Sequence, residues 1–163
     1  MDVTLDRTTA RDPAYAELAS AQEREMSQRY RSPDPGPGAL DDDAALVARL
    51  DGEPVGCVAV HRLSNEVGEV KRLYVRESAR GHRIGRRLLQ GAEDLARDLG
   101  YRSLRLEVGD RQPEALAIYR SSAWHEIEPY GYFKDYPGVV CFERHLREAG
   151  SAAAGERMHE RAE

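Results

Sequence analysis

The sequence contains little cysteine and no long apolar run. Only Cys57 and Cys141 occur among its 163 residues, and each lies in a short apolar stretch, which predicts buried, reduced thiols. Neither has a cysteine or histidine at a metal-ligand spacing, so we expect no metal site. No stretch approaches the roughly 18 apolar residues of a membrane-spanning helix, and the first residues lack an apolar signal core. We therefore expect a cytoplasmic protein that does not bind membranes.

An excess of positive charge is also missing. The chain has 24 lysine and arginine residues against 29 aspartate and glutamate residues, a net charge of -5 at pH 7. This balance argues against nucleic acid as a partner, because binding to a polyanion needs a positive surface. Any anion site must instead come from a local cluster of basic residues.

The length and composition are those of one folded domain. Hydrophobic residues make up 40% of the chain and charged residues 33%, which is ordinary for a globular protein. We expect this domain to span residues 1–148. Residues 149–163 are mostly small and charged and show no apolar periodicity, which predicts a disordered C-terminal tail.

The apolar pattern predicts a mixed α/β fold. Helical spacing and end signals indicate helices over residues 13–26, 84–99 and 113–122. Short apolar runs bounded by turn signals predict strands over residues 3–5, 44–50, 55–62, 69–75, 103–108, 124–127 and 139–146. Their order predicts an antiparallel meander that leads into a strand–helix–strand unit.

The clearest sign of function is a basic cluster where the second helix begins. Four arginines (80, 83, 86 and 87) and His82 surround its first turn, together with Gly81 and Gly85. Positive charge at a helix N-terminus is unfavourable by roughly 0.3–1 kcal/mol per charge. A bound polyphosphate removes the conflict, because backbone N–H groups and arginine forks both bind anions and glycines allow close approach. The alternative is a solvated basic helix start held by carboxylates such as Glu77.

Two segments carry a family resemblance. Arg80 and Gly85 match the first and last positions of R/Q-x-x-G-x-G/A, the phosphate-binding motif of the GNAT superfamily of N-acetyltransferases. Arg83 replaces the middle glycine, where a left-handed backbone would strain arginine unless Gly81 takes it instead. Farther along, residues 112–119 resemble the family pattern N-x-x-A-x-x-L-Y, with glutamine at the first position and tyrosine at the last.

The resemblance covers approximately residues 3–146 and implies a complete architecture. The GNAT fold is a single α/β domain whose mixed, mostly antiparallel sheet is flanked by helices and contains a splayed central parallel strand pair. Acetyl-CoA is the implied cosubstrate, with no metal. The implied cofactor-binding residues are Leu73, Tyr74, Val75, Arg80, Gly81, His82, Arg83, Ile84, Gly85, Arg86 and Gln112.

The strand before the basic cluster breaks its alternation. Leu73 and Val75 share one parity and Val70 has the other, so one extra residue near Lys71 and Arg72 would place all three on one face. That irregularity predicts a β-bulge. In GNAT proteins the corresponding strand is bulged, and the pantetheine arm of the cofactor lies in the cleft beside it.

The resemblance also suggests catalytic residues. Tyr119 is the candidate acid that protonates the departing thiolate, and Glu69 is the candidate base for the attacking amine. His61, on the adjacent strand, is a rival base with a suitable ordinary pKa. The alternatives are a tyrosine that packs the helix on the sheet and a glutamate that pairs with Lys71 or Arg72.

The predicted function is acetyl transfer from acetyl-CoA to an amine of a small molecule or peptide, by direct attack in a ternary complex. The alternative is a catalytically silent acyl-CoA-binding sensor or interaction module. The resemblance to the family also suggests a homodimer. The clues to the acceptor conflict, because residues 41–43 favour a cation and Arg31 and Lys134 favour a carboxylate. An aromatic wall could also form from Tyr130, Tyr132, Phe133 and Tyr136.

Overall fold

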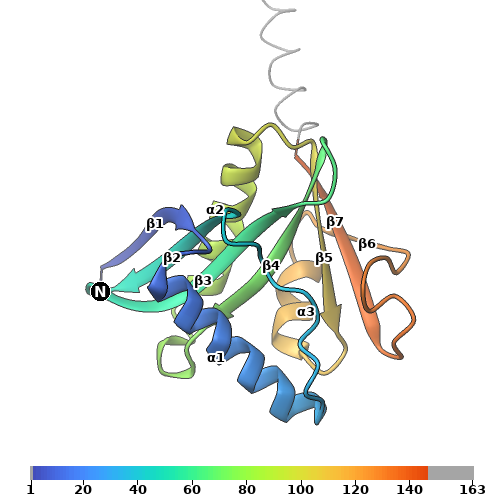
Figure 1. The fold of residues 1–163 in the computed structure, drawn as a ribbon, viewed down its shortest axis with the longest axis horizontal. Helices are drawn as coiled ribbons and strands as arrows, with labels where there is room; N and C mark the ends of the chain where they lie inside the picture. Colours follow the sequence, from blue (N-terminus) through green and yellow to red (C-terminus); the bar gives the residue numbers. More distant parts are fainter. Residues whose placement is uncertain (1, 147–163) are drawn as a thin grey trace, which may run out of the picture.

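The computed structural model describes residues 2–146, and the predicted tail lies outside them. A seven-stranded sheet in the order β1-β2-β3-β4-β5-β7-β6 forms the centre (Figure 1). All neighbouring strands run antiparallel except the parallel pair β4 and β5, which confirms the predicted fold class. The elements are β1 (Val3–Thr9), α1 (Pro13–Tyr30), β2 (Ala44–Leu50), β3 (Glu53–Arg62), β4 (Val67–Val75), α2 (Ile84–Asp98), β5 (Ser103–Gly109), α3 (Pro113–Arg120), β6 (His125–Ile127) and β7 (Val139–His145), with a 3-10 turn at Glu77–Ala79.

Helices cover both faces of the sheet, with α1 in front and α2 behind in Figure 1. Strand β3 shows how the sequence produces this layering. Cys57 and Ala59 pack into the cluster beneath α1, whereas Val58 and Val60 pack into the larger core with α2 and α3. Because successive side chains of a strand point to opposite faces, an uninterrupted apolar run can serve two cores.

Several predicted boundaries were wrong. The first strand runs four residues past Leu5 to Thr9, and β3 and β4 each begin two residues earlier than expected. Helix α1 continues one turn past Met26 to Tyr30, and Arg31 ends it in a left-handed conformation while donating its N–H toward the last turn. That final turn is polar, so apolar spacing could not detect it. The sixth strand begins at His125, because Trp124 precedes it as a buried core residue.

The parallel strands β4 and β5 diverge. Their pairing stops at Glu69 and Arg105, although the strands continue to Val75 and Gly109. This confirms the expected splayed pair. No hydrogen-bonded ladder joins the far halves of these strands, so space for a ligand can open between them.

A bulge accompanies the divergence, as predicted. Cys57 of β3 pairs with Tyr74 and Ala59 pairs with Lys71, so two steps on β3 oppose three on β4. Arg72 lies inside the bulge and has a φ of 54°, in the left-handed region. The extra residue therefore bends β4 at the point where it leaves β5.

None of the helices within residues 2–146 has the length and apolar character that a membrane span requires.

Candidate active site between the diverging strands

A cleft opens where β4 and β5 separate. Residues of both strands line it, and α1, α3 and two long loops complete its walls. The lining comprises Gln22, Pro35, Pro37, Glu69, Val70, Lys71, Arg72, Leu73, Leu106, Glu107, Val108, Gln112, Tyr119, Tyr132 and Phe133. Both predicted catalytic residues, Tyr119 and Glu69, are therefore on this cleft, together with Gln112 and Leu73 of the predicted cofactor set.

The predicted anion loop begins beyond the end of β4. Arg83 is the N-cap residue of α2 with φ 60°, and no side chain caps the free N–H groups of the first turn. Gly81 has φ 91° as well, so both positions adopt positive φ values. Arginine in that conformation is strained by roughly 1–3 kcal/mol. Strain, uncapped N–H groups and exposed guanidinium groups together fit a phosphate site.

The loop lies against the second motif. A side-chain atom added at Gly85 would meet Ile118 of α3 and Val75 of β4 at 3.7 and 3.8 Å. Arg86 donates to the Ser121 hydroxyl at 2.9 Å, just after α3. His82, Arg83, Arg86 and Arg87 are exposed, whereas the Ile84 side chain is buried and anchors the helix start in the core. Two segments that resemble family motifs are thus neighbours in space.

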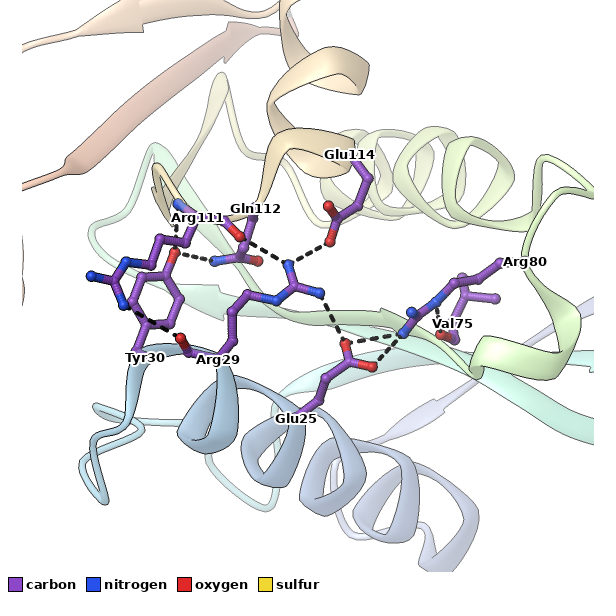
Figure 2. A network of polar contacts seen from close by, with 8 residues as sticks. All are labelled: Glu25, Arg29, Tyr30, Val75, Arg80, Arg111, Gln112 and Glu114. Atoms are coloured by element: carbon purple, nitrogen blue, oxygen red, sulfur yellow. Dashed lines mark hydrogen bonds and ion pairs between the residues drawn. The ribbon is translucent and has the colours of Figure 1, made fainter.

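Arg80 belongs to a network of polar contacts that joins α1, the anion loop and α3 (Figure 2). Its Nε donates to the Val75 carbonyl at 3.0 Å, and its Nη2 donates to both carboxylate oxygens of Glu25 at 2.8 and 3.0 Å. Arg29 pairs with Glu25 at 3.7 Å and with Glu114 at 2.6 Å. A phosphate bound by Arg80 would therefore compete with the Glu25 carboxylate. The Tyr74 ring lies beneath the Arg80 guanidinium, 5.8 Å from it.

Gln112 occupies the start of α3 and faces the cleft. Its Nε2 donates to the Tyr30 hydroxyl at 3.5 Å, and the Arg111 N–H donates to the same oxygen at 3.1 Å. Tyr30 therefore ties the end of α1 to the start of α3, as Figure 2 shows. These contacts fix one wall of the cleft.

Tyr119 is almost completely buried, with 5% of its surface exposed. Its ring packs against Trp124 and Phe142, with centroids 5.8 and 5.4 Å away. Within residues 2–146 its hydroxyl has no hydrogen-bond partner, although the side chain lines the cleft. Burial raises the pKa of Tyr119, so the phenol keeps its proton at neutral pH. The side chain thus packs the helix on the sheet and also presents a protonated donor.

Glu69 is buried and lies at the point of divergence, with 4% of its surface exposed. The Lys71 ammonium approaches one carboxylate oxygen at 2.7 Å, and the Tyr130 hydroxyl donates to the other at 2.6 Å. Of the two pairings considered from sequence, the one with Lys71 forms. The rival base His61 is the register partner of Glu69, but its ring binds Asp43 at 2.8 Å and lines neither cavity described here.

A second cavity adjoins the cleft on the side of the long loops, and we call it the loop pocket. It shares Gln22, Arg72 and Glu107 with the cleft. Apolar and aromatic side chains form much of its wall: Met26, Tyr30, Pro35, Phe133, Tyr136, Pro137 and Val139. Arg31, Lys134 and residues 41–43 line neither cavity. Three of the four predicted aromatic residues, Tyr132, Phe133 and Tyr136, line one cavity or both.

The two loops around this pocket contact each other. Tyr132 donates its hydroxyl to Asp34 at 2.7 Å, which joins residues 130–138 to residues 31–38. Phe133 stacks edge-on against Tyr132 and Tyr136, with centroids 4.8 and 5.3 Å away. Part of the aromatic loop therefore packs on itself, and part faces the pocket.

Two site residues were missed from the sequence. Glu107 lines both cavities and accepts the N–H groups of Tyr132 and Phe133, each at 3.1 Å. Burial raises the pKa of Glu107, and the nearby charge of Glu69 raises it further. Its parity on β5, opposite to the apolar Leu106, was an available signal.

Arg72 is the second missed residue. Its side chain, partly buried at the bulge, donates to the Gly36 carbonyl at 3.0 Å and holds the loop over the cleft. From the sequence, Arg72 was considered only as an ion-pair partner for Glu69. In the structure its Nε lies 3.5 Å from the Glu23 carboxylate instead.

The comparisons with known proteins agree with this geometry. Residues 11–123 match the sequence model of the acetyltransferase (GNAT) family. An IAA acetyltransferase of Azospirillum brasilense is 35% identical over 152 residues, which cover 89% of this chain and 99% of that protein. A Klebsiella pneumoniae structure, provisionally described as an acyl-CoA N-acyltransferase, aligns with a TM-score of 0.75 and 28% identity over 88% of this chain and 97% of that one.

A third match has the same fold at lower identity. A GNAT family acetyltransferase of Elizabethkingia anophelis, solved with acetyl-CoA bound, aligns with a TM-score of 0.65 and 20% identity over 88% of this chain and 98% of that one. The family match spans most of the chain, and the fold and the diverging strands agree with it. This chain belongs to the acetyltransferase (GNAT) family.

Proposed function

We propose that this protein transfers the acetyl group of acetyl-CoA to a primary amine by direct attack in a ternary complex. The observation that carries the proposal is the cleft between β4 and β5, which Tyr119 and Glu69 both line. Family membership supports acetyltransferase activity, and a protein of the same fold binds acetyl-CoA. Within the described residues, neither cysteine lines the cleft.

Direct attack follows from the state of the thiols. Cys57 and Cys141 are both fully buried. Burial raises the pKa of the Cys57 thiol to about 12, so it stays protonated and is a poor nucleophile. A covalent acetyl-enzyme on either sulfur is therefore disfavoured.

The anion loop supports the binding of the cofactor's pyrophosphate. We assign this role to Arg80, Arg83 and Arg86 with the free N–H groups at the start of α2. Gly81, His82, Ile84 and Gly85 form the backbone of the loop. Gln112, at the start of α3, lines the cleft and is assigned to the cofactor there. Leu73, Tyr74 and Val75 offer backbone groups to the pantetheine arm, and the bulge at Arg72 turns them away from β5. Bound acetyl-CoA supplies the thioester.

Tyr119 is assigned as the general acid. Its phenol keeps its proton because burial raises its pKa. When the tetrahedral intermediate collapses, a donor beside the departing sulfur protonates the thiolate. Backbone N–H groups of Leu73 or Tyr74 would stabilise the oxyanion that precedes this step.

Glu69 is assigned as the base that accepts the proton of the amine, directly or through water. Lys71 and Tyr130 orient its carboxylate at 2.7 and 2.6 Å. Glu107 shares the cleft and is the second candidate, since its raised pKa makes it the better proton acceptor near neutral pH. Separate Glu69→Gln and Glu107→Gln variants distinguish the two, because the base is the residue whose loss removes the acid limb of the pH–rate profile.

The loop pocket favours a cationic amine with an apolar or aromatic body. Met26, Phe133 and Tyr136 offer apolar surface, and the Glu107 carboxylate lies among them. An aromatic wall beside a carboxylate attracts an alkylammonium group through both charge and ring faces.

An acceptor screen tests this function. Purified protein with acetyl-CoA is assayed for free thiol release against arylalkylamines, polyamines, amino acids, short peptides and IAA, the last because a relative is named for it. We expect arylalkylamines to give the highest kcat/KM. Acetyl-CoA binding without turnover of any amine would support the silent binding module instead.

A further inference from the structure

Two imidazoles and a carboxylate converge on the outer strands, away from the cleft. His125 lies on β6, and Glu143 and His145 lie on β7. His125 is the register partner of Glu143, and His145 follows two residues later on the same face. One ligand atom from each of the three lies within 4.8 Å of the others.

The separations suit a tetrahedral ion. The carboxylate Oε1 of Glu143 lies 3.5 Å from His145 Nε2 and 4.0 Å from His125 Nε2. Tetrahedral Zn²⁺ with ligand bonds of about 2.0–2.2 Å keeps its ligand atoms roughly 3.3–3.6 Å apart. The two histidine side chains are 48% and 44% exposed, so small rotations can bring both nitrogens to those distances.

The carboxylate is already held in place for this role. Glu143 is buried, and its Oε2 accepts a hydrogen bond from Arg105 Nε at 2.5 Å. Its Oε1 makes no hydrogen bond to any residue in 2–146 and faces the two imidazole nitrogens. Ligands oriented by an outer partner of this kind are typical of protein metal sites. The imidazole rings lie nearly parallel, with centroids 4.8 Å apart and planes inclined by 27°.

We propose that His125, Glu143 and His145 bind a divalent transition-metal ion, with Zn²⁺ as the favoured occupant and water in the fourth position. Two imidazoles and one carboxylate are ligands that Zn²⁺ accepts readily. The ion would join β6, an edge strand of only three residues, to β7. These strands carry the loop with the aromatic wall, and the ion would hold them together at the end opposite that loop.

Zinc titration of tag-free, chelator-treated protein tests the proposal. At pH 7.5 we expect one Zn²⁺ per chain by calorimetry. His125→Ala and His145→Ala should each weaken binding at least about 10-fold, since even loss of an outer-shell partner has an effect of that size.

His61→Ala is the matched control. His61 also contacts a carboxylate, Asp43, at 2.8 Å, but within the described residues no second imidazole completes that pair. Zinc binding unchanged by His61→Ala and weakened at least about 10-fold in the other two variants would support the site. The half-exposed positions of His125 and His145 favour folded alanine variants, and Glu143→Gln provides an independent test. Absence of stoichiometric binding to the unmodified protein, or binding unaffected by all three ligand variants, would overturn the proposal.

Discussion

Replacing Tyr119 by phenylalanine removes one oxygen atom and leaves the packing intact. The ring keeps its contacts with Trp124 and Phe142 at 5.8 and 5.4 Å. Its hydroxyl has no hydrogen-bond partner within residues 2–146, so no group is left unpaired and stability should change by less than about 1 kcal/mol. If the phenol is the acid, kcat should fall by roughly 10²–10⁴, the usual contribution of general acid catalysis. The affinity for acetyl-CoA should stay the same.

Steady-state kinetics with an accepted amine, thermal denaturation and acetyl-CoA calorimetry together separate these effects. Tyr101→Phe is the matched control, because Tyr101 is partly buried, burial raises its pKa as it does that of Tyr119, and it lines neither cavity. Because the pKa of Tyr119 is raised above 10, ionisation of the phenol should not limit the rate anywhere between pH 6 and 9. Unchanged kcat in Tyr119→Phe, with activity equal to the Tyr101 control, would refute the acid assignment.

Three further variants probe the frame around the cleft. Glu69→Gln should lower thermal stability by roughly 1–3 kcal/mol, because the Lys71 ammonium loses its carboxylate at 2.7 Å, and an unchanged melting temperature would contradict that coupling. Arg83→Gly should raise stability by about 1 kcal/mol, seen as a melting temperature higher by roughly 2–4 °C, because its φ of 60° suits glycine. A lower melting temperature would mean that the arginine side chain stabilises the loop. Gly56→Ala should destabilise the sheet by roughly 1–3 kcal/mol, since the new Cβ would lie 2.8 Å from the Tyr74 carbonyl, and denaturant unfolding with no shift in midpoint would show that β3 and β4 can separate freely.

Local patterns predicted most of the fold. The helix that begins at Ile84 keeps a seven-member apolar spacing, and nearly all of those side chains are buried in the structure. The bulge near Arg72 was predictable because the parity of Val70 disagrees with that of Leu73 and Val75. Both signals depend on residues close together in the chain, where side-chain period and backbone geometry are directly linked.

The hydrogen bonds and ion pairs of the site were not predictable, because they join segments that lie far apart in the sequence. Tyr130 binds Glu69 across 61 positions of sequence. Glu107 holds residues 130–138 by accepting the backbone N–H groups of Tyr132 and Phe133. Every residue except proline has such a group, so the side chains in the sequence do not indicate the contact. The sequence suggested no metal site because its cysteines lack suitable spacing, whereas the histidine cluster arises from the register of β6 on β7. The homodimer and the disordered tail remain predictions.

Calorimetric titration with acetyl-CoA tests the central claim most directly. The chain should bind acetyl-CoA, and Arg80→Ala/Arg86→Ala should weaken binding by at least about 100-fold, because each charge-assisted hydrogen bond contributes roughly 1.5–3 kcal/mol. Arg102→Ala is the control, since Arg102 is an exposed arginine paired with Glu66 at 3.3 Å outside the cleft. Binding lost in the double variant and kept in the control is the predicted result. No binding to the unmodified protein, or equal binding by all three proteins, would contradict the assignment of this loop as the cofactor's phosphate site.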